Sequence, residues 1–293
     1  MSSIVAKLSK HKLINPEHAF VVDTAYEVIM GSTAYGVSEN SSDIDVYGVC
    51  VPNKAMIFPH LTGYIGGFDD KPANFEVYQK HHVVLDGKEY DTNIYSIIKY
   101  FRMCAISSPN ILDSLFVPTR CILQMNDVGG HMRANRHMFL SKCILDKMRG
   151  YAFTEMKKLE SGYDPKKGGN RAENVEKYGY DTKSGYHVIR LMLQAEMVLA
   201  ECDLDLERNR DQLKYARNGG YTLSELKEWF KQKEMDLATL YTNSELPVIA
   251  DFDKIRVLLK ECLEIQFGSL EIAQQVDADA IEVIENIRRL VNK

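Results

Sequence analysis

Hydrophobic and polar positions follow two different periods along the chain. Up to about residue 130, short runs in which apolar and polar residues alternate are separated by turn residues, which is typical of β-strands. The predicted strands cover 26–30, 43–51, 75–84 and 88–93. A helix is predicted over 95–105, and Pro109 suits the first turn of the next helix.

Beyond residue 130 the apolar residues recur at helical spacing. Helices are predicted over 131–159 and 184–201, and the remainder is expected to be helical with breaks near 218–220 and 245–247. We therefore expect an α+β protein in two domains. Residues 1–130 would form a mixed sheet with helices, and residues 131–293 an all-helical domain.

Composition excludes several classes of protein. The chain has 293 residues, of which 45% are hydrophobic and 26% charged, as in globular proteins rather than disordered or fibrous ones. No apolar run approaches the roughly 20 residues that span a bilayer, and the first residues do not resemble a secretory signal, so we expect a cytoplasmic protein. The six cysteines are widely spaced, which favours reduced thiols over a zinc site or a redox pair.

Charge is distributed unevenly. The net charge is -5, but residues 131–190 hold 13 Lys and Arg against 7 Asp and Glu. An acidic protein of this kind is not a general nucleic-acid coat, although its basic middle segment could meet a polyanion.

The strongest chemical signal lies in residues 31–46. Asp43 and Asp45 are two residues apart on a predicted strand, so their carboxylates point to the same face. Neighbouring carboxylates repel each other unless they share a hard cation such as Mg²⁺. Gly31 permits close approach of the backbone to a ligand, and Ser32 offers a hydroxyl and an amide at a helix N-terminus, where phosphates bind. This equipment indicates phosphoryl or nucleotidyl transfer, and the apolar strand after Asp45 disfavours a solvated turn as the alternative.

Gly-Ser followed after ten residues by Asp-x-Asp resembles the signature of the DNA polymerase β nucleotidyltransferase superfamily. More narrowly, GSTAYGVSENSSDIDVYGVCVP at 31–52 resembles the RlaP-type nucleotidyltransferases of bacteria and phages, which were proposed to act in RNA repair. Three later segments are similar to further motifs of that family: SPNILDSL at 108–115, KSGYHVIRL at 183–191 and RNGG at 217–220. The resemblance spans about 20–225. It implies a polymerase-β-like nucleotidyltransferase head before the helical domain, in a bacterial cytoplasm or encoded by a phage.

The resemblance also implies a two-metal site. Asp43 and Asp45 would hold Mg²⁺, or Mn²⁺ in its place, on the triphosphate of an NTP. Family members take a third carboxylate from a later strand, for which Glu89 and Asp91 are both candidates. We prefer Asp91, because it leads directly into the following helix, and expect it to help deprotonate the attacking hydroxyl.

The expected nucleotide-binding residues are Gly31, Ser32, Thr33, Lys183, His187 and Arg190. The last three fall at i, i+4 and i+7 and share one helix face. They would form a basic patch over the triphosphate or the acceptor strand, with a solvated helix face as the alternative. Thr33 stands where many relatives carry Arg or another polar residue, which leaves the nucleotide preference open.

Two further groups of residues carry a weaker signal. Lys166, Lys167 and Arg171 lie in or beside a Gly-rich loop, which could close over a polyanion or simply be solvated. His81 and His82 are adjacent on a predicted strand, where neighbouring side chains point to opposite faces, so we do not expect them to bind one metal ion.

Together these features predict metal-dependent transfer of a nucleoside monophosphate from an NTP to a hydroxyl acceptor, with release of pyrophosphate. An RNA or tRNA 3′ end is the first acceptor, and it would bind through residues 131–190. One alternative is transfer of AMP or another NMP to a protein or small molecule. Another is a non-catalytic nucleotide-binding regulator, which the intact carboxylates disfavour.

Overall fold

The computed structural model describes residues 3–38, 43–70, 72, 74–161, 170–270 and 290, except for the side chains of residues 170 and 171. The Gly-rich loop therefore lies outside the described residues over 162–169, and so do Lys166, Lys167 and the side chain of Arg171. Among the described helices, none is both long enough and apolar enough to cross a membrane. All six cysteines are described and carry free thiols, and Cys50, Cys104, Cys121 and Cys262 are buried.

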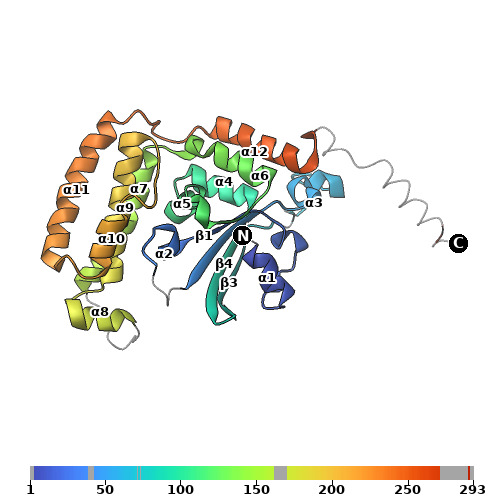
Figure 1. The fold of residues 1–293 in the computed structure, drawn as a ribbon. Coiled ribbons are helices and arrows are strands. Elements are labelled where there is room, and N and C mark those ends of the chain that lie inside the picture. Colours follow the sequence, from blue (N-terminus) through green and yellow to red (C-terminus); the bar gives the residue numbers. More distant parts are fainter. Residues whose placement is uncertain are drawn as a thin grey trace.

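A mixed five-stranded sheet lies at the centre of the first part of the chain (Figure 1). Its strands are β1 (Thr24–Ile29), β2 (Ile44–Cys50), β3 (Val77–Leu85), β4 (Lys88–Ser96) and β5 (Ile122–Met125). In the order β3-β4-β2-β1-β5, only β2 and β4 pair in parallel, and the other neighbours are antiparallel. The four predicted strands are confirmed, whereas β5 is too short to show a period in the sequence.

Helices surround this sheet and form the second part of the chain. Within the described residues they are α1 (Ile4–Lys10), α2 (Gly31–Ala34), α3 (Lys54–Ile57), α4 (Ile97–Ala105), α5 (Pro109–Leu115), α6 (Asp127–Ala134), α7 (Cys143–Ser161), α8 (Asn170–Tyr178), α9 (Thr182–Glu201), α10 (Arg210–Arg217), α11 (Leu223–Asn243) and α12 (Phe252–Phe267). The predicted α+β class with C-terminal helices is confirmed.

The continuous helix predicted over 131–159 is wrong. The chain leaves α6 after Ala134, makes a short 3-10 turn at Arg136–Phe139, and enters α7 only at Cys143. Leu140 is extended, and both Phe139 and Leu140 are buried in the core. Burial of these two side chains at a change of direction accounts for the break, which helical spacing alone could not reveal.

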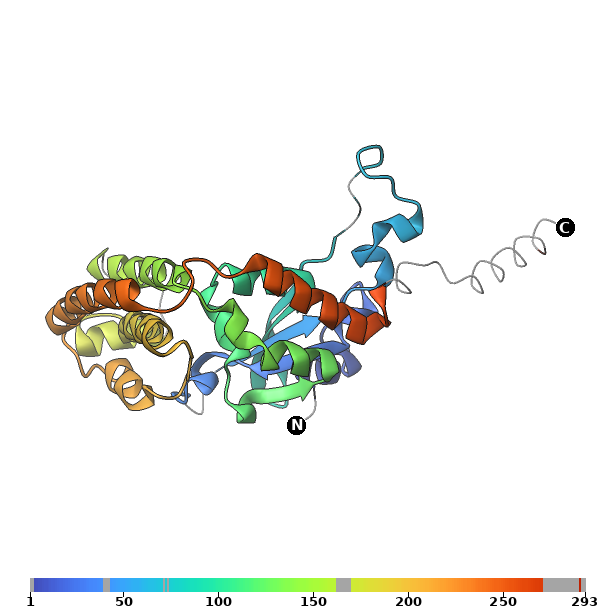
Figure 2. The same cartoon turned by 90° about the horizontal axis from the view of Figure 1, so that it is seen from above.

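The helices α7, α9, α10 and α11 pack together on one side of the sheet, as Figures 1 and 2 show. The central helix of this group is α9, which contacts α7, α10 and α11 and is buried along most of its length. α6 packs on β1, and α12 returns to cover α6 and α4. One cluster of buried hydrophobic residues includes members from Ala25 to Leu263, on both sides of residue 130. The packing therefore has no gap at residue 130, and a division into two domains there is a proposal.

A buried ion pair joins the two parts of the chain. The carboxylate of Asp113 on α5 accepts hydrogen bonds from Arg190 Nη1 and Gln194 Nε2 on α9, both at 3.0 Å. It also accepts one from the hydroxyl of Tyr35, just after α2, at 2.6 Å. The Arg190 guanidinium donates to the same hydroxyl and lies 4.5 Å from the centre of the Tyr35 ring. The exposed fractions of the Arg190 and Asp113 side chains are 6% and 0%, so α2, α5 and α9 meet at a contact shielded from water.

Removing one partner of this pair should destabilise the fold strongly. Asp113→Leu leaves the Arg190 charge buried and uncompensated, which should cost about 3–5 kcal/mol of unfolding free energy. The double variant Asp113→Leu/Arg190→Met removes both charges and should lose much less. Urea unfolding followed by circular dichroism measures both values.

The matched control is the exposed pair between Asp146 and Arg149 on α7. Asp146→Ala should change the unfolding free energy by less than about 1 kcal/mol, because solvent screens exposed ion pairs. A double variant at Asp113 and Arg190 as unstable as the single one would contradict a charge-pair origin of the effect.

Candidate active site

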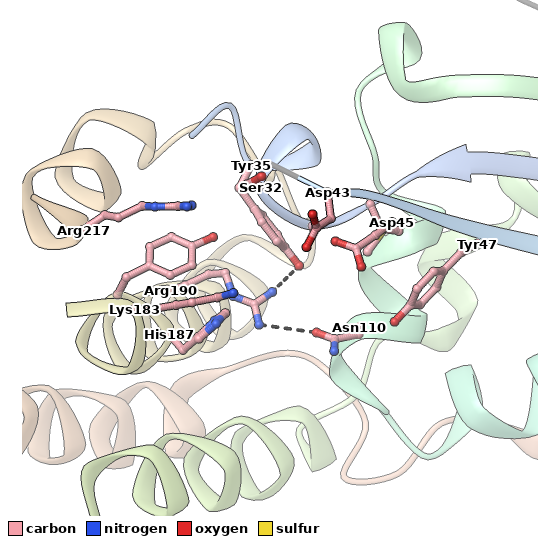
Figure 3. Close-up of a pocket in the computed structure, with 13 residues that line it drawn as sticks. Ser32, Tyr35, Asp43, Asp45, Tyr47, Asn110, Lys183, His187, Arg190 and Arg217 are labelled. Carbon is pink, nitrogen blue, oxygen red and sulfur yellow. Dashed lines mark hydrogen bonds between the residues drawn. The ribbon is translucent and has the colours of Figure 1, made fainter. Parts of the chain in front are cut away.

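A pocket of about 330 Å³ lies where α2 and the start of β2 face α9 (Figure 3). The predicted site residues that line it are Gly31, Ser32, Asp43, Asp45, Lys183, His187 and Arg190. It is completed by Met30, Tyr35, Tyr47, Asn110, Tyr186 and Arg217. Each of the four sequence segments that carried a motif therefore contributes to one cavity, although up to 186 positions separate them.

Glycine suits the first position of the turn that opens α2 for two reasons, its backbone conformation and the space around it. Gly31 has φ +62°, and a Cβ placed on it would lie 2.0 Å from Oδ2 of Asp45. The carboxylate of Asp45 therefore rests against the backbone of the turn. The first amides of a helix have no partner within the helix, so those of this turn are available to a ligand. Thr33 does not line the pocket, and its carbonyl oxygen accepts a hydrogen bond from Arg120 Nη2 instead.

Three carboxylates come together across β2 and β4. Asp43 precedes β2, and Asp45 lies within it, directly beside Asp91 in the parallel register. Burial raises the pKa of Asp45, and the negative charges of Asp91 and Asp43 raise it further, while Lys183 lowers it. Asp91 does not line the pocket itself, yet its charge acts on the carboxylate that does.

Glu89 lies two residues before Asp91 on β4 and has a different partner. Its carboxylate forms an ion pair with the ring of His82, and the backbone N–H of His82 donates to Asp91 Oδ1 at 2.8 Å. His81 Nδ1 lies 3.5 Å from Asp91 Oδ2. The expectation that the two histidines point to opposite faces is wrong, because β3 bulges between Lys80 and Val83.

Ligand atoms of His82, Glu89 and Asp91 lie within 4.8 Å of one another. Both histidine rings also contact a carboxylate of this group, His81 that of Asp91 and His82 that of Glu89. The bulge has no turn residue to mark it in the sequence, where the two histidines simply continue the strand.

Helix α9 supplies the cationic wall of the pocket. Lys183 is exposed in its first turn, His187 is partly buried, and Arg190 is buried. For Arg190 the alternative of a solvated helix face is therefore wrong. Its Nη2 donates to Oδ1 of Asn110 at 3.4 Å, as Figure 3 shows. Asn110 and Arg217 were not expected at the site, although both belong to motif segments.

Comparisons with known proteins agree with this picture. The sequence matches the family model described as "RlaP: RNA repair pathway DNA polymerase beta family" over residues 5–243. A crystal structure of a nucleotidyltransferase-like protein from Exiguobacterium sibiricum 255-15 is similar at 12% identity, over 80% of this chain and 76% of that chain, with a TM-score of 0.30. No curated protein matches the sequence. Since the family model covers most of its length, the chain belongs to the RlaP family and is a nucleotidyltransferase of the DNA polymerase β superfamily.

Proposed function

We propose that the protein transfers a nucleoside monophosphate from an NTP to a hydroxyl group, in the pocket between β2 and α9. The observation that carries the proposal is the meeting of a phosphate-binding turn, an acidic wall and a cationic wall in one cavity. Phosphoryl and nucleotidyl transfer depend mainly on positioning the reactants and on neutralising the charge of the phosphates. The turn and the two walls could do both.

The carboxylates fit a pair of divalent cations. Asp43, Asp45 and Asp91 offer the oxygen ligands that Mg²⁺ and Mn²⁺ prefer. Burial, followed by the charges of Asp91 and Asp43, raises the pKa of Asp45, so its ionised form is unfavourable there, and a cation would offset this cost. When bound, the cations would offset the negative charge of the phosphates.

The side chains and amides of the chain would then carry the reaction. Ser32 and the amides of 31–33 would hold the β- and γ-phosphates, with Lys183 and Arg217 facing them. Asp91 would accept the proton of the attacking hydroxyl. The hydroxyl oxygen bonds to the α-phosphorus as the bond to the bridging oxygen breaks, and pyrophosphate leaves in line.

An RNA or tRNA 3′ end is our first acceptor. The family description and the excess of Lys and Arg in 131–190 support this choice. Transfer of AMP or another NMP to a protein or small molecule is the second candidate, favoured by the net negative charge on both sides of that segment. The division into a catalytic domain, 1–130, and a helical domain, 131–293, belongs to the same proposal.

Locating a labelled nucleotide tests the function. The protein is incubated with Mg²⁺, each α-labelled NTP in turn, total RNA and total protein, and the products are separated. We expect the label to appear in RNA, and unlabelled pyrophosphate to be released in an equal molar amount. Label in protein would favour the second candidate, and absence of transfer from every NTP would contradict the enzymatic proposal.

Neutralising either member of the Asp-x-Asp pair should remove activity without unfolding the protein. Asp43→Asn and Asp45→Asn should each lower transfer at least about a hundredfold, because each removes a metal-binding charge. Without metal, Asp45→Asn should melt at the wild-type temperature or above. The raised pKa of Asp45 means that its ionised form costs stability at neutral pH, and asparagine lacks that charge.

Activity assays and thermal melting measure these effects. Asp236→Asn on the exposed face of α11 is the control and should behave as wild type. If both active-site variants keep most of their activity, the assigned mechanism is wrong.

The third carboxylate should matter for the acceptor more than for the nucleotide. Asp91→Ala should abolish single-turnover transfer while keeping much of the affinity for Mg²⁺-NTP, since Asp43 and Asp45 remain. Glu89→Ala should cost little in either assay, because Glu89 is paired with His82. An inactive Glu89→Ala beside an active Asp91→Ala would reverse the assignment.

A methyl group on Gly31 should displace the carboxylate of Asp45 and so disrupt the site. Gly31→Ala places a Cβ against Oδ2 of Asp45, so transfer should fall by at least about a hundredfold, as misplaced reacting groups do. Gly67→Ala is the matched control, because Gly67 has φ +86° with open space around it. Both variants bear about 1–2 kcal/mol of left-handed backbone strain. Equal activity of the two would show that contact with Asp45 is unimportant.

A further inference from the structure

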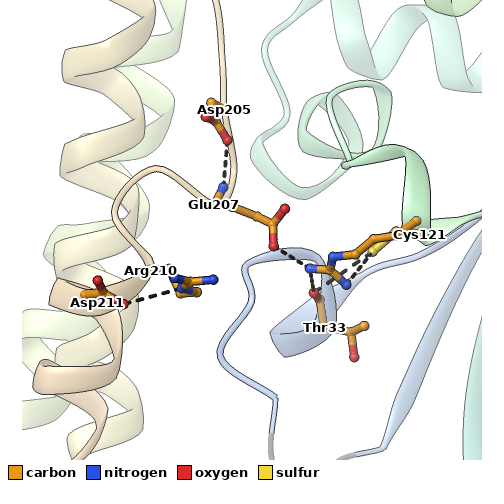
Figure 4. A network of polar contacts seen from close by, with 7 residues as sticks. Thr33, Cys121, Asp205, Glu207, Arg210 and Asp211 are labelled. Carbon is orange, nitrogen blue, oxygen red and sulfur yellow. Dashed lines mark hydrogen bonds and ion pairs between the residues drawn. The ribbon is translucent and has the colours of Figure 1, made fainter.

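The segment 31–36 is held to the helical part of the chain at two points. The inner point is the hydroxyl of Tyr35, which bonds Asp113 and Arg190 in the buried core. The outer point is the carbonyl oxygen of Thr33, at the end of α2. Arg120 Nη2 donates to this oxygen at 2.8 Å and to Glu207 Oε1 at 2.6 Å. Figure 4 labels Thr33 and Glu207, the two residues that these hydrogen bonds join.

The outer point joins elements that are remote in sequence. Arg120 belongs to the short turn before β5, and Glu207 lies in the connection between α9 and α10. The guanidinium of Arg120 is steadied by a contact of its Nη1 with Cys121 Sγ at 3.4 Å. The backbone N–H of Glu207 donates to Oδ1 of Asp205 at 3.0 Å, which orders that connection.

Close packing at Gly36 brings the two sides together. Gly36 has φ +68°, and a Cβ on it would lie 2.9 Å from Cδ of Arg210 and 3.1 Å from Oε1 of Glu207. The segment therefore approaches the start of α10 as closely as glycine permits. The last residue of α10 is Arg217, which lines the pocket opposite Ser32. The contacts of Arg120 with Thr33 and Glu207 therefore form a bridge that joins α2 to the connection that leads into α10. This bridge lies outside the pocket that α2 and α10 line.

Stability alone is a poor explanation of this bridge. The Arg120 and Glu207 side chains are 46% and 34% exposed. Ion pairs with such exposure contribute about 1 kcal/mol or less to folding, so their removal should hardly move the melting temperature. A single guanidinium nitrogen, Nη2 of Arg120, instead donates to both the carbonyl of Thr33 and the carboxylate of Glu207, which sets the separation of these two acceptors.

We propose that Arg120 and Glu207 are positioning residues of the phosphate subsite, which hold the turn 31–36 at a set distance from α10. This proposal rests on the proposed function. It adds two residues outside the pocket, Arg120 and Glu207, that set the distance between the turn and α10 and so the width of the pocket. Neither side chain lines the cavity, so both act through Thr33 and through α10. Small displacements of a positioning group are costly, and a shift of 1 Å can lower a reaction rate by about a hundredfold.

Calorimetric titration with a non-hydrolysable NTP and Mg²⁺ tests the bridge in the full-length protein. Arg120→Ala and Glu207→Ala should each weaken binding about tenfold, which is about 1.4 kcal/mol of binding free energy, while the melting temperature changes little. The double variant should be no weaker than either single one, because the two side chains act as a unit. Glu207→Gln keeps an acceptor for Arg120 and should recover most of the affinity.

The matched controls come from a neighbouring ion pair. Arg208 and Glu201 are bonded to each other with similar exposure, 43% and 47%, and among the described residues neither has a hydrogen bond or ion pair to the turn 31–36. Arg208→Ala and Glu201→Ala should bind the nucleotide as wild type does.

The outcomes separate this inference from the proposed function. Wild-type affinity in Arg120→Ala overturns the positioning role alone, and so does a loss that appears only with a fall of many degrees in melting temperature. Failure of the wild-type protein itself to bind any NTP overturns the proposed function and the positioning role with it.

Discussion

Arg190 carries its charge into the protein interior, where an unpaired charge is unfavourable by several kcal/mol. Only Asp113 neutralises it there, within the described residues, and Asp113 sits on a different element at a sequence distance of 77 residues. The helix α9 and the helix α5 are therefore bound to one another by a requirement for charge balance. Since the hydroxyl of Tyr35 contacts both charges, the turn 31–36 is fixed to the same point, and the pocket forms where these three elements meet.

The pocket, by contrast, brings like charges together, which is electrostatically unfavourable. Three carboxylates lie on the sheet side. Burial of Asp45 and the charges of Asp91 and Asp43 raise its pKa, and the charge of Lys183 on α9 partly compensates. Folding tolerates this arrangement because the buried pair, the packing of α9 and the fit of Asp45 against Gly31 hold it in place. A ligand that brings divalent cations and a polyphosphate would offset the charges of both walls, which is the basis of our proposal that a metal-bound nucleotide binds here.

Local patterns in the sequence predict the local features well. Alternating apolar residues located four strands, and the Gly-Ser and Asp-x-Asp spacing located residues that line one cavity. Features that depend on distant partners were not accessible in this way. Nothing near Arg190 in the sequence indicates Asp113, so a residue read as a nucleotide ligand is also a structural anchor. The bulge at His82 and the break after Ala134 likewise arise from packing against other elements, which no local period records.

The most direct test of the account is a crystal structure of the protein with Mn²⁺ and a non-hydrolysable NTP, with anomalous diffraction to locate the metal. The account predicts manganese between Asp43, Asp45 and Asp91, with the β- and γ-phosphates against the amides of 31–33 and the cationic side chains of α9 opposite. Manganese and phosphates bound elsewhere, with these carboxylates unliganded, would contradict it.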